Sequence, residues 1–284
     1  MLDEIDATPY TPTFTEQADD VKVETSADLK TNVGTPDEET KVISLKFEVP
    51  PTNANPIMYA NIFRGKNLGS VVTDAQKTAI QDGTFKDLFI GDYWVINGIT
   101  WRIADMDYFY NVGITAFTKH HLVMIPDEVL YLDVMNDSAT TEGGYVGSKM
   151  YTTGLEQAKI AINSSFGSLV QTHKDCLINA TENGRPTQFD WVNSTVELMN
   201  EIMVYGCCIR GAMGTGTLQA RNYTTAKKQL SIFRLNPKML NKRQNIWLRD
   251  INSSFAFASV GSYGDASSGL ADTSLGVRPY FVIG

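Results

Sequence analysis

The sequence is poor in cysteine and has no long apolar run. Cys176, Cys207 and Cys208 are the only cysteines among 284 residues, and an adjacent pair is a poor disulfide, so we expect no disulfide framework. Such usage is typical of a chain that folds in a reducing cytoplasm. No apolar run approaches the roughly 18 residues of a membrane-spanning helix. Residues 1–6 are acidic and lack the apolar core of a signal peptide, so we expect none at this end.

Net charge is almost absent from most of the chain. Residues 1–40 hold eleven of the 32 acidic residues and two of the 24 basic ones, which gives −9, whereas the other 244 residues carry +1 and the total is −8. A nearly neutral body without a basic face argues against nucleic-acid binding. The excess charge is therefore confined to an N-terminal arm.

This arm, residues 1–50, is rich in Thr, Pro, Asp and Glu, and its apolar residues are scattered. By itself it buries too little apolar surface to offset the entropy lost on ordering. We therefore hypothesise that a partner chain orders the arm, with a solvated tail as the alternative. Residues 41–49 alternate like a strand, and Pro50-Pro51 ends that segment.

Residues 51–284 contain the signals expected of a packed domain. A second short apolar run covers 57–64. A helix is predicted to begin after Thr73, because Gln76 completes a capping box with it, and to end near Gly83.

A hairpin is predicted around Asn97-Gly98, which joins two aromatic and β-branched segments at 88–96 and 99–103. Asn-Gly between two such segments is a strong hairpin signal. Trp94 and Trp101 flank the turn, and we expect both to pack in the core.

Further elements are expected along the middle of the chain. Residues 121–132 resemble a strand interrupted at Pro126, and residues 230–235 a short strand. A second helix is predicted after Ser148, since apolar residues through Phe166 recur at helical spacing. A third is predicted to start after Asn193 or Ser194 and to end at Gly206. Strands and helices do not alternate as βαβ units, so the predicted class is α+β with mainly antiparallel small sheets.

The closing segment, residues 246–283, is the most informative part of the sequence. An aromatic and basic strand at Trp247–Arg249 precedes a long polar loop rich in Gly, Ser and Asp, and an apolar terminal strand follows. We expect four residues to be structural framework together with the tryptophan pair: Trp247, Arg249, Arg278 and Pro279. Asp250 or a nearby carboxylate is the expected partner of Arg249. Four loop residues are candidates for contact with a ligand or host: Tyr263, Asp265, Ser267 and Asp272.

Other potential chemical sites have weak sequence support. His120 and His121 point to opposite faces of a strand, so they are not expected to share a metal, and we predict one buried and one exposed histidine. Cys207 and Cys208 follow a helix C-terminus, which disfavours a thiolate, so we expect free buried thiols.

Two loops have some of the residues that ion-binding sites use. The glycine-rich stretch 211–216 lacks the Lys-Ser/Thr of a phosphate-binding loop and is expected to be a flexible surface loop. Asp265 and Asp272 do not have EF-hand spacing, and a solvated loop is favoured over a calcium site. The sequence therefore predicts no catalytic residues, no metal and no cofactor.

Trp247-Leu248-Arg249, the Gly/Ser loop and Gly276-Val277-Arg278-Pro279 together resemble the C-terminal motif of a C-type-lectin-like domain family common in phage and bacterial surface proteins. Tropism determinants and formylglycine-generating enzymes are distant relatives that share the fold. Weaker similarities occur in the expected order at 91–94, 143–148 and 194–199. The resemblance covers roughly residues 57–284 and leaves the arm outside.

The resemblance implies two principal helices that flank small antiparallel sheets, with long loops on one side. The chain departs from sugar-binding lectins because it lacks their disulfides and their Glu-Pro-Asn calcium motif. It also lacks the cysteine arrangement of formylglycine-generating enzymes. Neither calcium-dependent sugar binding nor that enzymatic activity is therefore carried over.

The leading hypothesis is a phage structural protein, either a head fibre or decoration protein or a tail-associated one. Residues 1–50 would anchor it to capsid, portal or tail subunits. Residues 51–284 would form a lectin-like domain that meets a host-surface glycan or protein, in a homo-oligomer located on the virion after synthesis in the host cytoplasm. The alternatives are a bacterial cell-surface adhesin and an enzyme of the formylglycine-generating type that uses Cys207 or Cys208.

Overall fold

The computed structural model describes residues 59–212, residue 214 and residues 229–284. The chain divides into two compact units, Met1–Ala54 and Asn55–Gly284, and every described residue belongs to the second. The predicted arm of residues 1–50, with its expected strand at 41–49, lies outside the described residues. None of the described helices is both long and apolar enough to cross a membrane.

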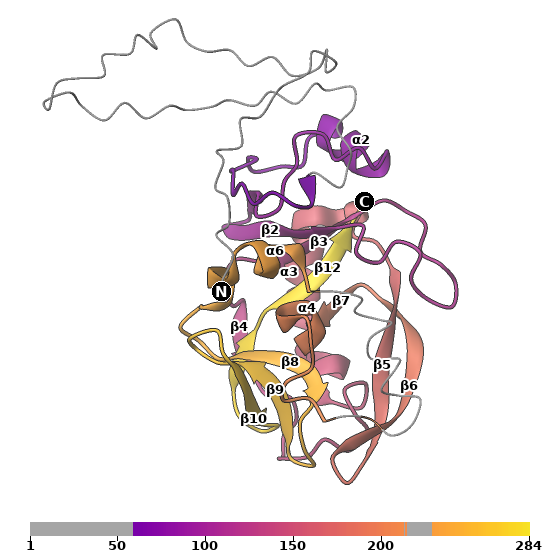
Figure 1. The fold of residues 1–284 in the computed structure, drawn as a ribbon, viewed down its shortest axis with the longest axis vertical. Helices are drawn as coiled ribbons and strands as arrows, with labels where there is room; N and C mark the ends of the chain where they lie inside the picture. The colour runs from indigo at the N-terminus through magenta and orange to yellow at the C-terminus, as the bar shows by residue number, and fades with distance from the viewer. Residues whose placement is uncertain (1–58, 213, 215–228) are drawn as a thin grey trace, which may run out of the picture. The chain divides into compact units, whose positions relative to one another are not determined.

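The first sheet is fully antiparallel, and the C-terminal strand is one of its interior strands (Figure 1). Its five strands lie in the order β1 (Tyr93–Ile96), β2 (Ile99–Met106), β3 (Leu122–Pro126), β12 (Pro279–Ile283) and β7 (Val196–Leu198). Because β12 pairs with both β3 and β7, the end of the chain joins two segments that are distant in sequence.

The second sheet contains most of the closing segment. Its strands lie in the order β10 (Ala266–Leu270), β9 (Ala256–Val260), β8 (Ile246–Ile251), β11 (Leu275–Val277) and β4 (Tyr131–Asp133). Only the contact between β8 and β11 is parallel. A separate hairpin of β5 (His173–Glu182) and β6 (Arg185–Ser194) lies at one side of the body (Figure 1).

The described helices are short. They are α2 (Asp74–Gln81), the π-helical turn η1 (Met150–Gly154), α3 (Glu156–Phe166), η2 (Gly167–Leu169), α4 (Glu201–Tyr205), α6 (Ser231–Leu235) and η3 (Pro237–Leu240). The predicted class, α+β with mainly antiparallel small sheets, is confirmed.

Local sequence signals place the first helix and the first hairpin correctly. The Thr73 hydroxyl accepts a hydrogen bond from the backbone N–H of Gln76, and the Gln76 side chain accepts one from the backbone N–H of Thr73. Asn97 and Gly98 both have positive φ, as a tight hairpin turn requires. Trp94 lies directly opposite Trp101, and both side chains are fully buried. The core positions predicted for the two tryptophans therefore follow from the hairpin register.

The helix predicted after Ser148 forms, but it begins with the π-helical turn η1. The Ser148 hydroxyl accepts a hydrogen bond from the backbone N–H of Tyr151, and the apolar positions Ala158, Ile162 and Phe166 of α3 are buried. The periodic pattern therefore identified the buried face correctly, although it gave no sign of the wider first turn.

Two secondary-structure predictions are wrong because tertiary contacts override local preference. Residues 231–235 form the helix α6 and not a strand, since the buried Asp105 carboxylate accepts hydrogen bonds from the backbone N–H and the hydroxyl of Ser231 at the helix start. The third helix begins only after Asn200, whose side chain accepts from the backbone N–H of Met203. The expected cap residues Asn193 and Ser194 instead end β6, and the residues from Val196 onward form β7, which pairs with β12.

The hairpin of β5 and β6 was not predicted, although it contains a usable signal. Asn183 and Gly184 have positive φ at its turn, like Asn97 and Gly98. The long polar loop expected in the closing segment is also wrong, because residues 256–260 and 266–270 are strands. Gly269 permits this pairing, since a Cβ there would lie 2.8 Å from the Trp247 ring.

The second sheet separates two apolar clusters. Ile246 and Leu248 of β8 belong to the larger cluster, which also contains Trp94 and Trp101. Trp247 and Ile251 of the same strand belong to the smaller cluster. Alternation along β8 therefore buries both of its faces, as expected of a central strand.

Candidate functional site

Two framework residues of the closing segment, Trp247 and Arg278, donate hydrogen bonds to backbone carbonyls of other segments. The Trp247 indole N–H donates to the Asp133 carbonyl at 2.9 Å. Arg278 donates to the carbonyls of Pro126 and Met239 at 2.9 and 3.0 Å, and burial lowers its pKa to about 10. Pro279 opens β12 opposite Leu198. Arg278 therefore ties the terminal strand to neighbouring backbone and not to a carboxylate.

Arg249 forms a buried ion pair with Asp175 of β5, a residue that the sequence did not single out. Its two terminal nitrogens donate to the two carboxylate oxygens at 2.7 and 3.1 Å. The Tyr280 hydroxyl donates to the same carboxylate. Burial is the largest influence on Arg249 and opposes its charge, but Asp175, Tyr280 and Glu197 together outweigh it and hold the pKa of Arg249 well above its usual value. The bidentate pair joins β5 to β8.

A second buried carboxylate, Glu197 of β7, lies in the same region. It accepts hydrogen bonds from the Tyr145 hydroxyl at 2.8 Å and the Ser194 hydroxyl at 2.9 Å. Burial raises the pKa of Glu197 to about 7, against the opposing effect of the Arg249 charge. This side chain therefore exchanges its proton near neutral pH.

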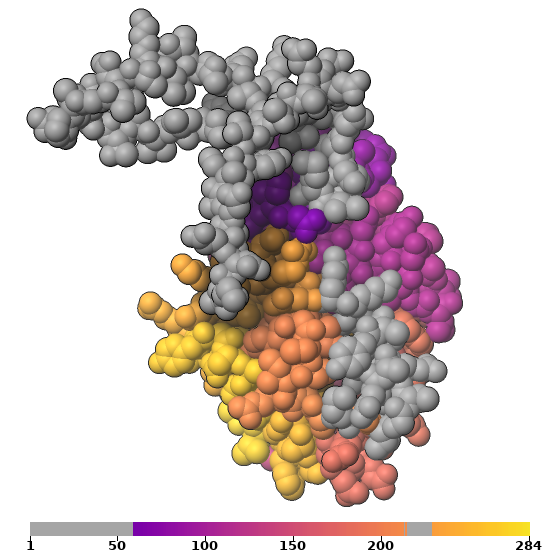
Figure 2. All heavy atoms as spheres, in the orientation of Figure 1, coloured from indigo at the N-terminus to yellow at the C-terminus, as the bar shows by residue number. Residues whose placement is uncertain are grey.

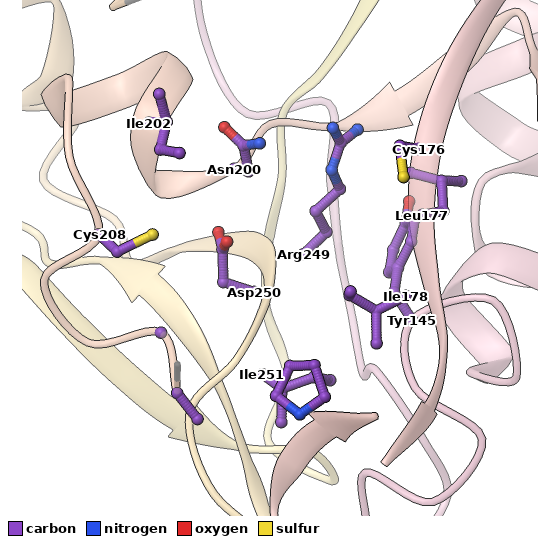
Figure 3. Close-up of a pocket in the computed structure, with 13 residues that line it drawn as sticks. Tyr145, Cys176, Leu177, Ile178, Asn200, Ile202, Cys208, Arg249, Asp250 and Ile251 are labelled. Carbon is purple, nitrogen blue, oxygen red and sulfur yellow. The ribbon is translucent and has the colours of Figure 1, made fainter. Parts of the chain in front are cut away.

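A small cavity lies beside the Arg249 pair (Figure 3). It has a volume of about 30 Å³, and its polar lining comes from Tyr145, Asn200, Arg249 and Asp250, with Cys208 at one side. Figure 3 shows Asp250 projecting into the space between Cys208 and Arg249. A space of this size holds on the order of one water molecule, so it does not admit a metabolite.

Two carboxylates beside this cavity fix α4, one at the start of the helix and one on the chain that follows it. Asp250 accepts a hydrogen bond from the backbone N–H of Glu201 at 2.7 Å. The Glu201 carboxylate accepts from the backbone N–H groups of Ile209, Arg210 and Gly211, each at 2.8 Å. Burial, reinforced by the Glu201 charge, raises the pKa of Asp250 to about 7.

The cysteines after α4 differ from each other. Burial and the charges of Asp250 and Glu201 raise the pKa of Cys208 to about 12, so its thiol stays protonated. Cys207 is exposed, which contradicts the predicted buried position. Neither Cys207 nor Cys208 forms a disulfide. The geometry at Cys208 is the opposite of what a nucleophilic thiolate requires.

The histidines occupy a separate aromatic region. His120 is half-buried, stacks on Tyr110 and lies 2.7 Å from the Asp107 carboxylate. His121 is fully buried and accepts a hydrogen bond from the backbone N–H of Phe109 at 3.1 Å. Burial lowers the pKa of His173 to about 4. Within the described ranges, no three His, Cys, Asp or Glu residues form a potential metal-binding group.

The predicted contact residues are divided between the two ends of β10. Tyr263 is 84% exposed and Asp265 is exposed in the turn between β9 and β10, which we call the 261–265 turn. Ser267 is half-buried on β10, and Asp272 is exposed beyond its far end. A five-residue strand spans roughly 17 Å, so Asp265 and Asp272 do not converge on one calcium ion.

The 261–265 turn is firmly attached to the body. The backbone N–H of Gly261 donates to the Asp265 carbonyl at 2.7 Å, and that of Gly264 donates to the Gly261 carbonyl at 2.8 Å. The Tyr205 hydroxyl of α4 also donates to the Asp265 carbonyl at 2.8 Å. The turn therefore holds Tyr263 outward in an ordered backbone.

Sequence reasoning missed Asp175, Glu197 and Tyr145 because each lies on a segment whose structure was not predicted or was predicted wrongly. The alternation of His173, Asp175 and Leu177, all buried on β5, was the available signal for Asp175. Of the glycine-rich stretch 211–216, only residues 211, 212 and 214 are described. The backbone N–H of Gly211 donates to the Glu201 carboxylate.

The closing segment thus contributes both to a buried polar network around Arg249 and to an exposed turn at 261–265. No protein-family model matches the chain, and comparisons with curated proteins and with solved structures find no similar protein.

Proposed function

We propose that the chain is a non-enzymatic structural protein of a phage virion. Residues 51–284 would form a C-type-lectin-like domain displayed on the particle. Residues 1–50 would attach it to capsid, portal or tail subunits. The observation that carries the proposal is the closing segment, which combines buried framework residues with an exposed and ordered turn.

The two halves of the closing motif meet in space, which supports the lectin-like interpretation. Gly276 of β11 lies opposite Ile246 of β8, and its backbone N–H donates to the Asn245 carbonyl at 2.8 Å. The arginines of the two halves, Arg249 and Arg278, are both buried. The motif therefore joins the terminal strand to the sheet from which β9 and β10 extend.

The 261–265 turn supports a role in surface contact. Tyrosine provides a large contact area with few rotatable bonds, and an ordered backbone loses little entropy when a partner binds. In Figure 2, residues from 229 onward form one continuous part of the visible surface, so the closing segment also faces solvent. A homo-oligomer would present several copies of this turn and would gain avidity for a host-surface glycan or protein.

Charge supports the separation of roles. Residues 1–40 of the arm carry −9, whereas the other 244 residues carry +1, so the arm suits a basic partner surface and the rest of the chain does not require one. An acidic extended segment fits a groove between subunits better than it fits a packed domain.

Incorporation into particles tests the proposal. Particles purified from a culture that carries the gene should contain the full chain, as measured by mass spectrometry and immunogold labelling. A chain without residues 1–45 should be absent from those particles, because its anchor is missing. Tyr263→Ala is the matched control and should be incorporated at the normal level. Absence of the full chain, or normal incorporation of the truncated chain, would contradict the proposal.

A further inference from the structure

Two open grooves flank the π-helical turn η1. The first, which we call the Tyr151 groove, has a volume of about 300 Å³ and is lined mainly by Tyr151, Thr152, Lys159, Asn193, Thr195 and Glu197. The second, the Asn136 groove, has a volume of about 520 Å³, and its lining includes Asn136, Asp137, Thr140, Glu142, Lys149 and Thr152. Thr152 lines both, so the two grooves meet at that residue. Together they are far larger than the cavity beside Arg249.

The π-helical turn is a rigid platform between the grooves. The backbone N–H of Leu155 donates to the Met150 carbonyl at 2.9 Å, which closes the wide turn. Met150 and Gly154 face inward, and the Tyr131 hydroxyl donates to the Gly154 carbonyl at 2.7 Å. Thr152 consequently faces solvent and Tyr151 remains partly exposed. Isolated π-helical turns are rare and are frequent at functional sites.

The Tyr151 groove combines one fixed aromatic ring with neutral polar groups, and Lys159 and Glu197 are its charged residues. The Tyr151 ring packs edge-on against the buried Tyr145 ring, with centroids 5.4 Å apart, and Tyr145 is held in turn by Glu197. Hydroxyl and amide groups of Thr152, Asn193 and Thr195 line the groove beside the ring. An aromatic face packs on the C–H face of a sugar ring, while hydroxyl and amide groups exchange hydrogen bonds with its hydroxyls.

The lysine of each groove already has a carboxylate partner. Lys159 donates to Glu156 at 2.7 Å, and Lys149 donates to Asp137 at 2.5 Å. Glu197 is occupied by the hydroxyls of Tyr145 and Ser194. An acidic ligand would therefore have to compete with Glu156 or Asp137 for these lysines, and the exposed Glu142 carboxylate of the Asn136 groove would repel it.

We propose that the two grooves form one continuous site, crossing at Thr152, for an elongated uncharged polyhydroxylated chain, that is, a neutral oligosaccharide. The Tyr151 ring packs against one sugar unit. The Asn136 groove takes the units that extend past Thr152. The site does not depend on a place in a virion, because binding is a property of the purified protein.

Saturation-transfer NMR on the purified full chain tests the site, with cellotetraose, maltotetraose, chitotetraose and mannotetraose as probes. At least one probe should receive saturation at millimolar concentration. Tyr151→Ala should weaken that binding at least roughly fivefold, because the stacking surface is lost. Thr152→Val and Asn193→Ala should weaken it as well, and they keep the test valid if removal of the Tyr151 ring disturbs folding.

Two matched controls separate this site from its surroundings. Thr153→Val changes an exposed threonine of the same turn that lines neither groove, and Tyr263→Ala removes the exposed tyrosine of the 261–265 turn; both should bind like the unchanged protein. The proposal is overturned if none of the four probes binds, if Thr152→Val and Asn193→Ala bind normally, or if Tyr263→Ala abolishes binding. Tighter binding of an oligogalacturonate than of every neutral probe would also overturn it.

Discussion

Arg249 and the 261–265 turn belong to the same closing segment, but their polar side chains differ in exposure. Those around Arg249 are buried and bonded to one another, whereas that of Tyr263 faces solvent. Arg249 is 6% exposed and both of its terminal nitrogens bind the Asp175 carboxylate. Tyr263 is 84% exposed, and only the backbone around it is fixed. Arg249 needs its side-chain partners to remain buried, whereas Tyr263 needs only a backbone that holds it at the surface. Substitutions should therefore affect stability in the first region and binding in the second.

The difference follows from the cost of removing charges from water. A buried ion pair is stable only when both partners and their remaining hydrogen bonds are present, so loss of one partner leaves an uncompensated charge. An exposed side chain keeps its water in the folded and unfolded states. Substitution of a polar side chain should consequently change the free energy of unfolding more in the buried network than in the exposed turn.

The largest expected effect is at Arg249. Arg249→Met should lower the free energy of unfolding by about 3–5 kcal/mol, because the buried Asp175 carboxylate loses its cation. Urea unfolding followed by circular dichroism measures this change. Arg249→Met combined with Asp175→Leu replaces the pair with apolar groups and should recover part of the loss. A loss below about 1 kcal/mol for the single variant would show that the Arg249–Asp175 pair does not stabilise the fold.

An intermediate effect concerns the pH dependence that Glu197 contributes. Its pKa is about 7 in the folded protein and 4.5 in its ordinary state, so the fold favours the protonated carboxyl. The stabilising contribution is complete below pH 4.5 and is lost as the pH rises through about 7. A difference of this size corresponds to about 3 kcal/mol.

Glu197→Gln should remove that contribution and flatten the dependence of unfolding free energy on pH between 4.5 and 7. Asp250, whose pKa is also raised to about 7, contributes a loss of the same sign in an overlapping window. Asp250→Asn is therefore the matched comparison, and the double variant should be flatter than either. Unchanged pH dependence in Glu197→Gln would mean that this carboxyl is solvated in the folded protein.

The smallest effect on stability is expected at the turn. Tyr263→Ala should change the free energy of unfolding by no more than about 0.5 kcal/mol, because the side chain is exposed. Under the proposed function, particles that carry this variant should adsorb more weakly to host cells, as measured by the adsorption rate. A large loss of stability would instead assign Tyr263 to the framework, and the comparison between the two regions would fail.

Local signals predicted those elements whose stability is local. The capping box at Thr73 and Gln76 and the Asn97-Gly98 turn each bring together residues that are close in sequence. The closing motif likewise indicated that Arg249 and Arg278 are framework candidates. The partner of Arg249 was not predictable in this way, because Asp175 is 74 residues away and lies on a strand that was missed.

By itself, the sequence determined the α+β class, the neutral body with its acidic arm, and the turns whose backbone geometry needs asparagine and glycine. Only the tertiary structure decided that 231–235 is a helix, that residues 256–260 and 266–270 are strands, and that Thr152 lies where two grooves meet. Capping and turn geometry involve a few neighbouring residues, so composition and spacing report them directly. Strand pairing, ion-pair partners and grooves join residues that are distant along the chain, and packing of the whole domain selects among their alternatives.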